Sequence, residues 1–257
     1  MRLVGRVWFV ILLALASTSA AWARPRPETG ETGASATALL ERMEAAVRLA
    51  DWARTGAVSW RFPGGREHLW DRDRGLARFR KGRKGRIEVL QPTDGSREGR
   101  VFRRGEEVTG PRRERLLDKA WKAFINDSFW LQPLASLRDE GVTLSIVDWN
   151  GEEGLFVEYA SGGVTPGDAY LWFLGDQGRP TMWRMWVQVV PFGGLKASWE
   201  GWQQLPTGAW ISTTHRLGPL RMKLRGVMAA PTLGELSPGD DPFAAFFAPF
   251  SATNPSR

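Results

Sequence analysis

Apolar and polar residues alternate along many short segments of this chain, and this period of two constrains the fold more than any other feature. Val58, Trp60 and Phe62 alternate with polar neighbours, and similar runs recur between turns that contain Gly or Pro. Such alternation is typical of strands with one buried face. Asn150-Gly151, between two alternating runs, strongly indicates a hairpin. The Pro-Gly-Gly turn at residues 63–65 predicts another hairpin, and residues 196–204 and 220–228 are each expected to form one strand. We therefore expect about ten or eleven antiparallel strands.

Two segments instead have apolar residues at three- and four-residue spacing, which is typical of amphipathic helices. They cover residues 37–53 and 113–125, and Asn126-Asp127 is expected to end the second helix. Many strands with only two or three helices predict a mainly β (α+β) fold. We expect a large curved antiparallel sheet that forms an incomplete β-barrel, closed by two or three helices.

The first 23 residues have the parts of a secretory signal peptide. Arg2 and Arg6 precede an apolar run over residues 7–16, and Ala21-Trp22-Ala23 matches a cleavage pattern. The run of about ten residues is too short to cross roughly 30 Å of hydrocarbon. We expect cleavage after Ala23 and a soluble protein in the periplasm, with an uncleaved membrane anchor as the weaker alternative.

Three further parts are expected after the signal peptide. Residues 24–36 are rich in Pro, Thr, Gly and Glu and predict a flexible lead. Residues 37–230 carry the periodic segments and form the folded domain, and residues 231–257 form a Pro- and Gly-rich tail. The chain contains no cysteine, so the domain must be stable without disulfides, and lipid attachment to cysteine is excluded.

The sequence contains no recognisable catalytic motif. His68 and His215 each stand alone on a predicted strand, and no metal-binding spacing, nucleophile elbow or phosphate-binding loop occurs. A pair of acidic residues that meet only in the folded chain is the remaining enzymatic alternative. We therefore expect no enzymatic activity, no catalytic residues, no cofactor and no metal.

Basic residues, nearly all arginine, are concentrated within residues 72–115, and the net charge of +7 falls to about +5 without the signal peptide. We expect Arg80, Arg83 and Arg86 to contact anionic lipids or an acidic partner. The alternative is an ordinary solvated face of the strands. Nucleic acid is not an expected partner, because no binding motif is present.

The chain contains fourteen tryptophans, and the alternation places several of them on one wide apolar face. This face is either an ordinary core filled by the helices or the lining of a cavity for an apolar ligand. The predicted lining of such a cavity consists of Trp60, Phe62, Trp70, Phe79, Phe129, Trp130, Trp183, Met185, Val187 and Trp199.

Four aromatic motifs stand at the end of the central helix and in the late strands. The central helix leads into the sequence NDSFWLQP at residues 126–133, and the late strands contain YLWF at 170–173, WEGW at 199–202 and GAWI at 208–211. In this order the motifs resemble those of the LolA-like group of outer-membrane lipoprotein-sorting proteins. The resemblance covers roughly residues 37–228. It implies a LolA-like half-barrel closed by helices around an acyl-chain cavity, which transfers lipid-modified protein between membrane-bound donor and acceptor proteins.

Together these features predict a periplasmic, non-enzymatic carrier or binder of a hydrophobic ligand. The expected ligand is an acyl chain of a lipid or lipoprotein, in lipoprotein sorting or envelope lipid transport, with transient contact to an anionic membrane surface. One alternative is a polysaccharide or cell-wall binding module, which predicts a row of exposed tryptophans. Another is an accessory subunit of an envelope complex.

Overall fold

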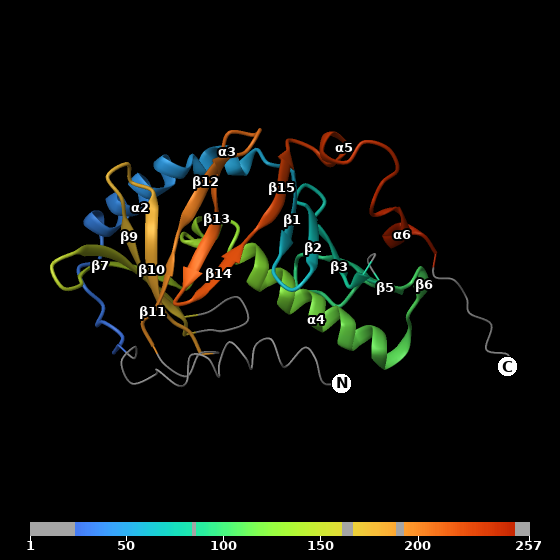
Figure 1. Ribbon diagram of the computed structural model, residues 1–257, viewed down its shortest axis with the longest axis horizontal. Helices are drawn as coiled ribbons and strands as arrows, with labels where there is room; N and C mark the ends of the chain where they lie inside the picture. Colours follow the sequence, from blue (N-terminus) through green and yellow to red (C-terminus); the bar gives the residue numbers. More distant parts are fainter. Residues whose placement is uncertain (1–23, 84–85, 161–166, 189–192, 250–257) are drawn as a thin grey trace. The chain divides into compact units, whose positions relative to one another are not determined.

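The computed structural model (Figure 1) describes residues 24–83, 86–160, 167–188 and 193–249, so the predicted signal peptide lies outside the described residues. The described chain forms two compact units. The first unit contains the described parts of Met1–Ala50, Gln132–Gln203 and Trp210–Lys223. The second unit contains those of Asp51–Leu131, Gln204–Ala209 and Leu224–Arg257. Each unit has its own sheet and its own core.

The second unit is built on a seven-stranded sheet with the order β15-β1-β2-β3-β4-β5-β6. Successive strands pair antiparallel, and the predicted hairpin at Pro63-Gly64-Gly65 joins β1 to β2. The strands are β1 (Ala57–Phe62), β2 (Arg66–Asp71), β3 (Leu76–Lys81), β4 (Ile87–Pro92), β5 (Arg100–Arg103), β6 (Glu106–Glu107) and β15 (Arg225–Ala230).

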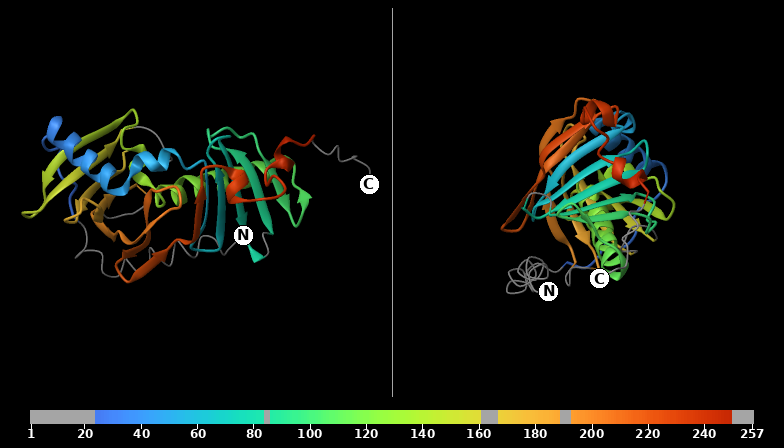
Figure 2. Two further views of the ribbon diagram at one scale, coloured as in Figure 1. Left: turned by 90° about the horizontal axis from the view of Figure 1, so that it is seen from above. Right: turned by 90° about the vertical axis from the view of Figure 1, so that its right-hand side faces the viewer.

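Helix α4 (Gly110–Phe129) packs against β3, β4 and β5 of this sheet (Figure 2). It starts earlier than predicted, after Thr109 in an extended conformation and with Pro111 in its first turn. Proline favours a first turn because its fixed φ suits the helix and it lacks only an unneeded N–H. The helix also continues through Asn126-Asp127, because the Asp127 side chain points into the core and bonds there rather than capping the helix end.

The opposite face of this sheet, which we call the outer face, is partly covered by the C-terminal tail. The tail contains α5 (Leu233–Leu236) and α6 (Ala244–Phe247). Between them, the fully buried Phe243 packs against Leu69, Leu76 and Leu90. These leucines alternate along their strands with the residues that face α4, so the sheet is apolar on both faces here.

The first unit contains a five-stranded sheet of order β11-β10-β9-β8-β7 and a three-stranded sheet of order β12-β13-β14. The predicted Asn150-Gly151 hairpin joins β7 and β8. The elements are α2 (Ala34–Val47), the 3₁₀ helix η3 (Pro133–Ser136), β7 (Val142–Asp148), β8 (Glu153–Tyr159), β9 (Ala169–Leu174), β10 (Pro180–Trp186), β11 (Leu195–Ser198), β12 (Glu200–Gln204), β13 (Trp210–Leu217) and β14 (Leu220–Lys223).

The helix predicted over residues 37–53 is divided into α2 and a short α3 (Leu49–Ala53). Arg48 separates them with a left-handed backbone, φ 53°. Part of the predicted lead is held against the rest of the first unit by two contacts. Glu31 forms an isolated antiparallel β-bridge with Ile146, and the indole N–H of Trp186 donates to the carbonyl oxygen of Arg24 at 2.9 Å.

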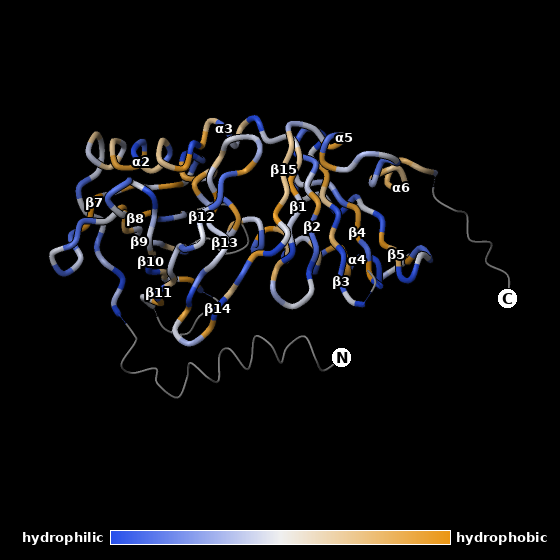
Figure 3. Tube along the Cα trace, turned by 45° about the horizontal axis from the view of Figure 1, so that its top comes forward, coloured by the Kyte–Doolittle hydropathy of each residue, from blue (hydrophilic) through white to orange (hydrophobic). Residues whose placement is uncertain are grey.

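The predicted fold class is confirmed: the chain is mainly β, with large antiparallel sheets and covering helices. Apolar and hydrophilic residues are interleaved along the strands, as the period of two requires (Figure 3). The described residues contain fifteen strands, more than expected. Two of the predicted strands are each interrupted, and the short β6 is a further addition. Residues 196–204 contain parts of β11 and β12, and residues 220–228 contain β14 and part of β15.

Candidate functional site

The residues predicted to line one hydrophobic cavity are divided between the two units. Trp60, Phe62, Trp70, Phe79, Phe129 and Trp130 belong to the second unit, whereas Trp183, Met185, Val187 and Trp199 belong to the first. The predicted lining residues of each unit are therefore described separately.

In the second unit, the predicted lining residues lie mainly between the sheet and α4. The ring of Trp60 is stacked on that of His68, with 4.6 Å between centroids, and Phe124 of α4 lies beside both rings. Phe79 belongs to a buried cluster with residues of β4, β5 and α4. Phe62 and Trp130 are also buried, and Trp70 and Phe129 are half-buried. These side chains contribute to the packed core of the second unit.

In the first unit, two of the predicted lining residues, Trp183 and Trp199, belong to a cluster of aromatic rings. The fully buried Trp183 has its ring centroid 4.6 Å from that of Trp172, 4.7 Å from that of Tyr170 and 4.9 Å from that of Trp199. Met185 is buried on the same strand, and Val187, just after it, is half-buried. The rings contact one another directly, in the edge-to-face and tilted geometries that aromatic pairs prefer.

His215 of β13 is buried beside this aromatic cluster. Its ring lies 4.5 Å from that of Trp199, and its Nδ1 lies 3.0 Å from the carbonyl oxygen of Ser198. Burial lowers the pKa of His215 to about 4, because the protonated ring would lose its hydration. The neutral ring is therefore the form that the folded chain holds.

This burial predicts a specific loss of stability in mild acid. The unfolded chain protonates His215 near pH 6.5 and the folded chain only near pH 4, so the stabilising effect is complete above pH 6.5 and is lost as the pH falls toward 4. Over this window we expect His215 to account for a loss of about 3 kcal/mol in the free energy of unfolding. Urea unfolding across this range, compared with the His215→Gln variant, measures it. Equal pH dependence in both proteins would contradict the assignment.

A buried polar network joins β2 to α4. The carboxylate of Asp127 accepts hydrogen bonds from Arg66 Nε at 2.6 Å and Nη2 at 2.8 Å, and it lies 2.8 Å from His68 Nε2. The side chains of His68 and Asp127 are 1% and 0% exposed. Because neither group is accessible to a substrate, this His–Asp pair serves to join the helix to the sheet.

Sequence reasoning did not find this network, although a signal for it was present. The buried positions of α4 are Leu117, Ala120, Phe124 and Asp127, at spacings of three, four and three residues. Asp127 therefore continues the apolar stripe of the helix, and a carboxylate in such a stripe requires a buried partner. His68 alternates with Trp70 on β2 and so faces the same helix.

The described residues contain neither a metal-binding cluster nor a membrane-spanning helix. No group of three or more His, Asp or Glu side chains within them is placed to hold a metal ion. None of the helices in the described ranges is both long and apolar enough to span a bilayer.

The C-terminal tail is anchored to the outer face of the second unit by two arginines. Arg74 Nη1 and Nη2 each donate to the carboxylate of Asp241 at 2.8 Å, and this contact lowers the pKa of Asp241 to about 2. Arg100 Nη1 donates to the carbonyl oxygens of Ala245 at 2.6 Å and Ala248 at 2.8 Å. The tail is therefore fixed on both sides of Phe246.

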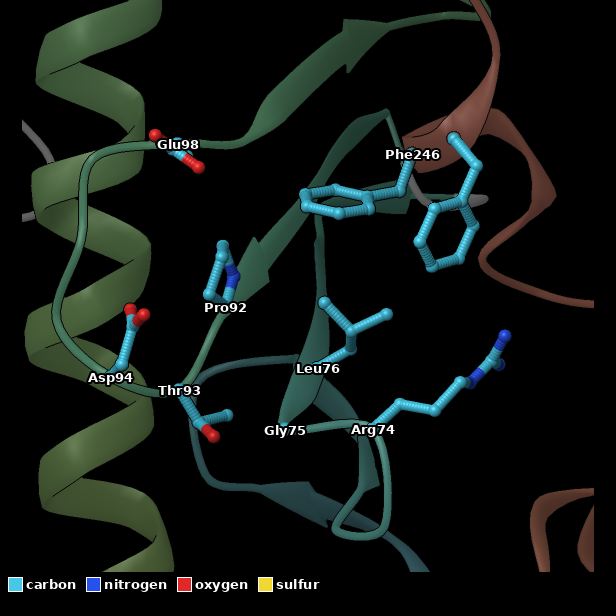
Figure 4. A pocket seen from close by; sticks show the side chains of 9 residues that line it. Arg74, Gly75, Leu76, Pro92, Thr93, Asp94, Glu98 and Phe246 are labelled. Atoms are coloured by element: carbon cyan, nitrogen blue, oxygen red, sulfur yellow. The ribbon is translucent and has the colours of Figure 1, made fainter.

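An open pocket of about 430 Å³, which we call the tail pocket, lies between the tail and the sheet (Figure 4). Phe246, Leu76 and Pro92 give it apolar walls, Asp94 and Glu98 lie on one side, and Arg74 lies on the other side, near Phe247. Phe247 also lines it and is 61% exposed, one of two large apolar side chains among the described residues that are this exposed. The pocket thus presents an apolar surface to solvent.

A second pocket of about 250 Å³, which we call the arginine pocket, lies further along the same sheet. It is lined by Ser59, Trp60, Arg61, Glu67, His68, Leu69, Arg78, Arg80, Gly226 and Met228. The rings of Trp60 and His68 face α4, so both residues reach this pocket through their backbone.

The arginine pocket includes one of the three arginines that were predicted to contact anions. Arg80 lines it, whereas Arg83 and Arg86 are exposed in the connection between β3 and β4 and are not among its lining residues. Alternation along β3 places Arg78 on the same face as Arg80, because the two positions are two residues apart. Arg78 belongs to the cluster of basic residues within residues 72–115, whereas Arg61 lies outside it and is not indicated by the sequence.

By fold, then, the chain is a mainly β protein of antiparallel sheets with open pockets on one sheet face. No family model matches the sequence, and no curated protein matches it. Among solved structures, the chain is similar to that of a DUF1329 family protein from Desulfovibrio piger, with a TM-score of 0.32 and 9% identity. The match covers 76% of this chain and 92% of that protein.

Proposed function

We propose that this chain is a non-enzymatic binder or carrier of a hydrophobic ligand, namely the acyl chains of a lipid or lipoprotein. The observation that carries the proposal is the tail pocket, where Phe246 and the exposed Phe247 face Leu76 and Pro92 around an open space of about 430 Å³. This volume lies within the usual range of ligand pockets, roughly 300–1,000 Å³. The proposed setting is the periplasm, after removal of residues 1–23, as the LolA-like resemblance implies.

The energetic basis of such binding is the removal of apolar surface from water. Each CH₂ group that becomes buried contributes about 0.8 kcal/mol to the binding free energy. Covering the exposed ring of Phe247 adds a further favourable contribution, because its apolar surface also leaves water. The side of the pocket formed by Asp94 and Glu98 is polar and leaves room for a hydrated headgroup. An amphiphile with its chain against the phenylalanines and its head toward this side suits the pocket.

The tail also provides a means of releasing the ligand. Its helix α6 contributes Phe246 and Phe247, and the tail is held by the contacts of Arg74 and Arg100 and by the packing of Phe243, not by strand pairing. Movement of this short segment would open the pocket without disrupting the sheet. A carrier in lipoprotein sorting or envelope lipid transport requires such release to a membrane-bound acceptor.

The exposure of the tryptophans favours this function over a polysaccharide-binding module. A stacking platform requires a row of exposed tryptophans, but every tryptophan in the described part of the chain is buried or half-buried. The large exposed apolar side chains there are Met228 and Phe247. An exposed phenylalanine in a pocket suits an acyl chain better than a sugar ring.

Binding of a fluorescent fatty-acid analogue tests the proposal. Phe247→Asp places a charge in the apolar part of the pocket and should weaken binding by about tenfold or more. A hydrated carboxylate at this position would prevent the burial of several CH₂ groups of the acyl chain. The folded state should be unaffected because Phe247 is exposed. Fluorescence titration measures the affinity.

Ala244→Asp is the matched control, because Ala244 is an exposed residue of the same helix that does not line the pocket. It should bind the analogue as the unchanged chain does. Equal affinity of the Phe247→Asp variant and the unchanged chain would refute the tail pocket as the ligand site.

A further inference from the structure

Strand register brings three arginines to one pocket on the outer face of the second unit. Arg61 of β1 lies opposite Glu67 of β2, and Glu67 lies opposite Arg80 of β3. Arg78 is two residues before Arg80 and therefore shares its face. All four residues line the arginine pocket of about 250 Å³.

Gly226 leaves room for one of these guanidinium groups. It has φ +57°, and a Cβ built at this position would lie 3.1 Å from Arg61 Nη2. Any larger residue would be strained by this backbone conformation and would crowd the Arg61 side chain. The β1–β15 pair is also irregular between Ser59 and Arg61, beside this glycine. The absence of a side chain at position 226 therefore leaves space for the Arg61 guanidinium in the pocket.

Two cations of the arginine pocket, Arg78 and Arg80, have distant acidic partners among the described residues. Arg78 Nε and Arg80 Nε lie 3.8 and 3.6 Å from the same oxygen of Glu88, which is too long for a hydrogen bond. Elsewhere in this unit, Arg66 and Arg100 form pairs with carboxylates at 2.6 and 2.5 Å. Arg66 and Arg100 therefore donate to carboxylates within the fold, whereas the Nε atoms of Arg78 and Arg80 do not donate to Glu88.

Two buried polar atoms in the same pocket lack hydrogen-bond partners among the described residues. They are Arg80 Nε and Ser59 Oγ. Burial also lowers the pKa of Arg78, because its guanidinium has lost hydration that Glu88 only partly replaces. An anion in the pocket would satisfy these donors, and buried donors are normally satisfied.

We propose that the arginine pocket binds a phosphate group. Guanidinium groups present donors in a planar fork that matches phosphate oxygens. A carboxylate has two oxygens and is satisfied by one arginine, whereas a phosphate offers three or more acceptors to Arg61, Arg78 and Arg80. The site is separate from the tail pocket, so the inference goes beyond acyl-chain binding and does not depend on it.

The phosphate could belong to a phospholipid headgroup or to a small soluble molecule, and two measurements separate these sources. Calorimetric titration of the exported chain with inorganic phosphate tests a free ligand. Cosedimentation with vesicles of phosphatidylglycerol, compared with vesicles of phosphatidylcholine, tests an anionic headgroup. Binding in either measurement that depends on the pocket arginines supports the site, and absence of binding in both overturns it.

A double variant that combines Arg78→Gln with Arg80→Gln identifies the site. Loss of two charge-assisted contacts should weaken phosphate or vesicle binding by about tenfold or more. The matched control is Arg83→Gln with Arg86→Gln, which removes the same charge from exposed residues outside the pocket. The control should change the affinity by less than about twofold in 0.15 M salt. Equal losses in both double variants would show a diffuse surface charge and overturn the proposal.

A third variant gives a result of opposite sign. Glu88→Gln removes the carboxylate that lies near both Arg78 and Arg80, so it should strengthen phosphate binding. Should the double variant fail to fold by its thermal unfolding curve, Arg80→Gln alone replaces it, since that side chain is 38% exposed. Weaker phosphate binding in a folded Glu88→Gln variant would contradict the proposed geometry.

Discussion

Replacing Asp127 by Ala is expected to lower the free energy of unfolding by about 3–5 kcal/mol. The carboxylate is fully buried and accepts hydrogen bonds from Arg66, while His68 lies against it at 2.8 Å. Its removal leaves a largely buried guanidinium without its counter-charge, in addition to a small cavity. The cost therefore comes mainly from the partners that remain unsatisfied.

Asp118→Ala on the same helix is the matched control. Asp118 is half-buried, with 43% of its side chain exposed, and its ion pair within the described part of the chain is with Lys122, one turn away, at 3.0 Å. Such pairs contribute about 0.3–0.5 kcal/mol, so the control should unfold almost as the unchanged chain does. Urea denaturation of both variants measures the difference. A loss below about 1 kcal/mol for Asp127→Ala would show that the network does not hold α4 to the sheet.

The local part of the fold could be predicted because alternation and turn chemistry act over a few residues. Pro63-Gly64-Gly65 and Asn150-Gly151 both lie at observed hairpins. The breaks within predicted strands were not predictable in this way. At Leu224 the chain leaves β14 and enters β15, which pairs with β1 about 170 positions earlier, Ala57 opposite Ala230. Alternation identifies the two faces of a strand and carries no information about its partner.

Because alternation does not identify the partner of a strand, it also could not show that the predicted cavity residues belong to two units. The period of two correctly places Trp60 and Phe79 on one face of β1 to β3, and Trp183 with Met185 on one face of β10. It cannot show that these strands belong to different compact units. It also gives no sign that Phe243 of the tail covers Leu69, Leu76 and Leu90 on the outer face.

Both pockets depend on contacts between distant segments, which explains why the sequence indicated only fragments of them. The tail pocket needs Phe246 to lie near Leu76, and the arginine pocket needs the register that places Arg61 and Arg80 on either side of Glu67. The dense arginines within residues 72–115 were visible in the sequence. Their separation into paired, pocket and exposed groups required the fold.

Met185→Arg is expected to destabilise the first unit by about 4 kcal/mol or more. Met185 is 6% exposed on β10, between Tyr170 of β9 and Leu195 of β11, and it follows Trp183 on the same face. An arginine here would place a charge among aromatic and aliphatic side chains. Neither Tyr170 nor Leu195 carries a carboxylate to pair with it. Circular dichroism in the near ultraviolet and urea unfolding should both report the loss of packing.

Thr181→Arg separates the effect of burial from that of added charge. Thr181 is an exposed residue of the same strand, so an arginine there remains hydrated and should cost less than about 0.5 kcal/mol. The opposite result for Met185→Arg would be equally informative. A folded variant that no longer binds a fluorescent fatty acid would mean that β10 lines a ligand cavity, as its alternation had suggested, since only an accessible lumen could hydrate the new charge. Unfolding of this variant, with Thr181→Arg intact, would assign Trp183 and Met185 to a packed core and leave the tail pocket as the place for an acyl chain.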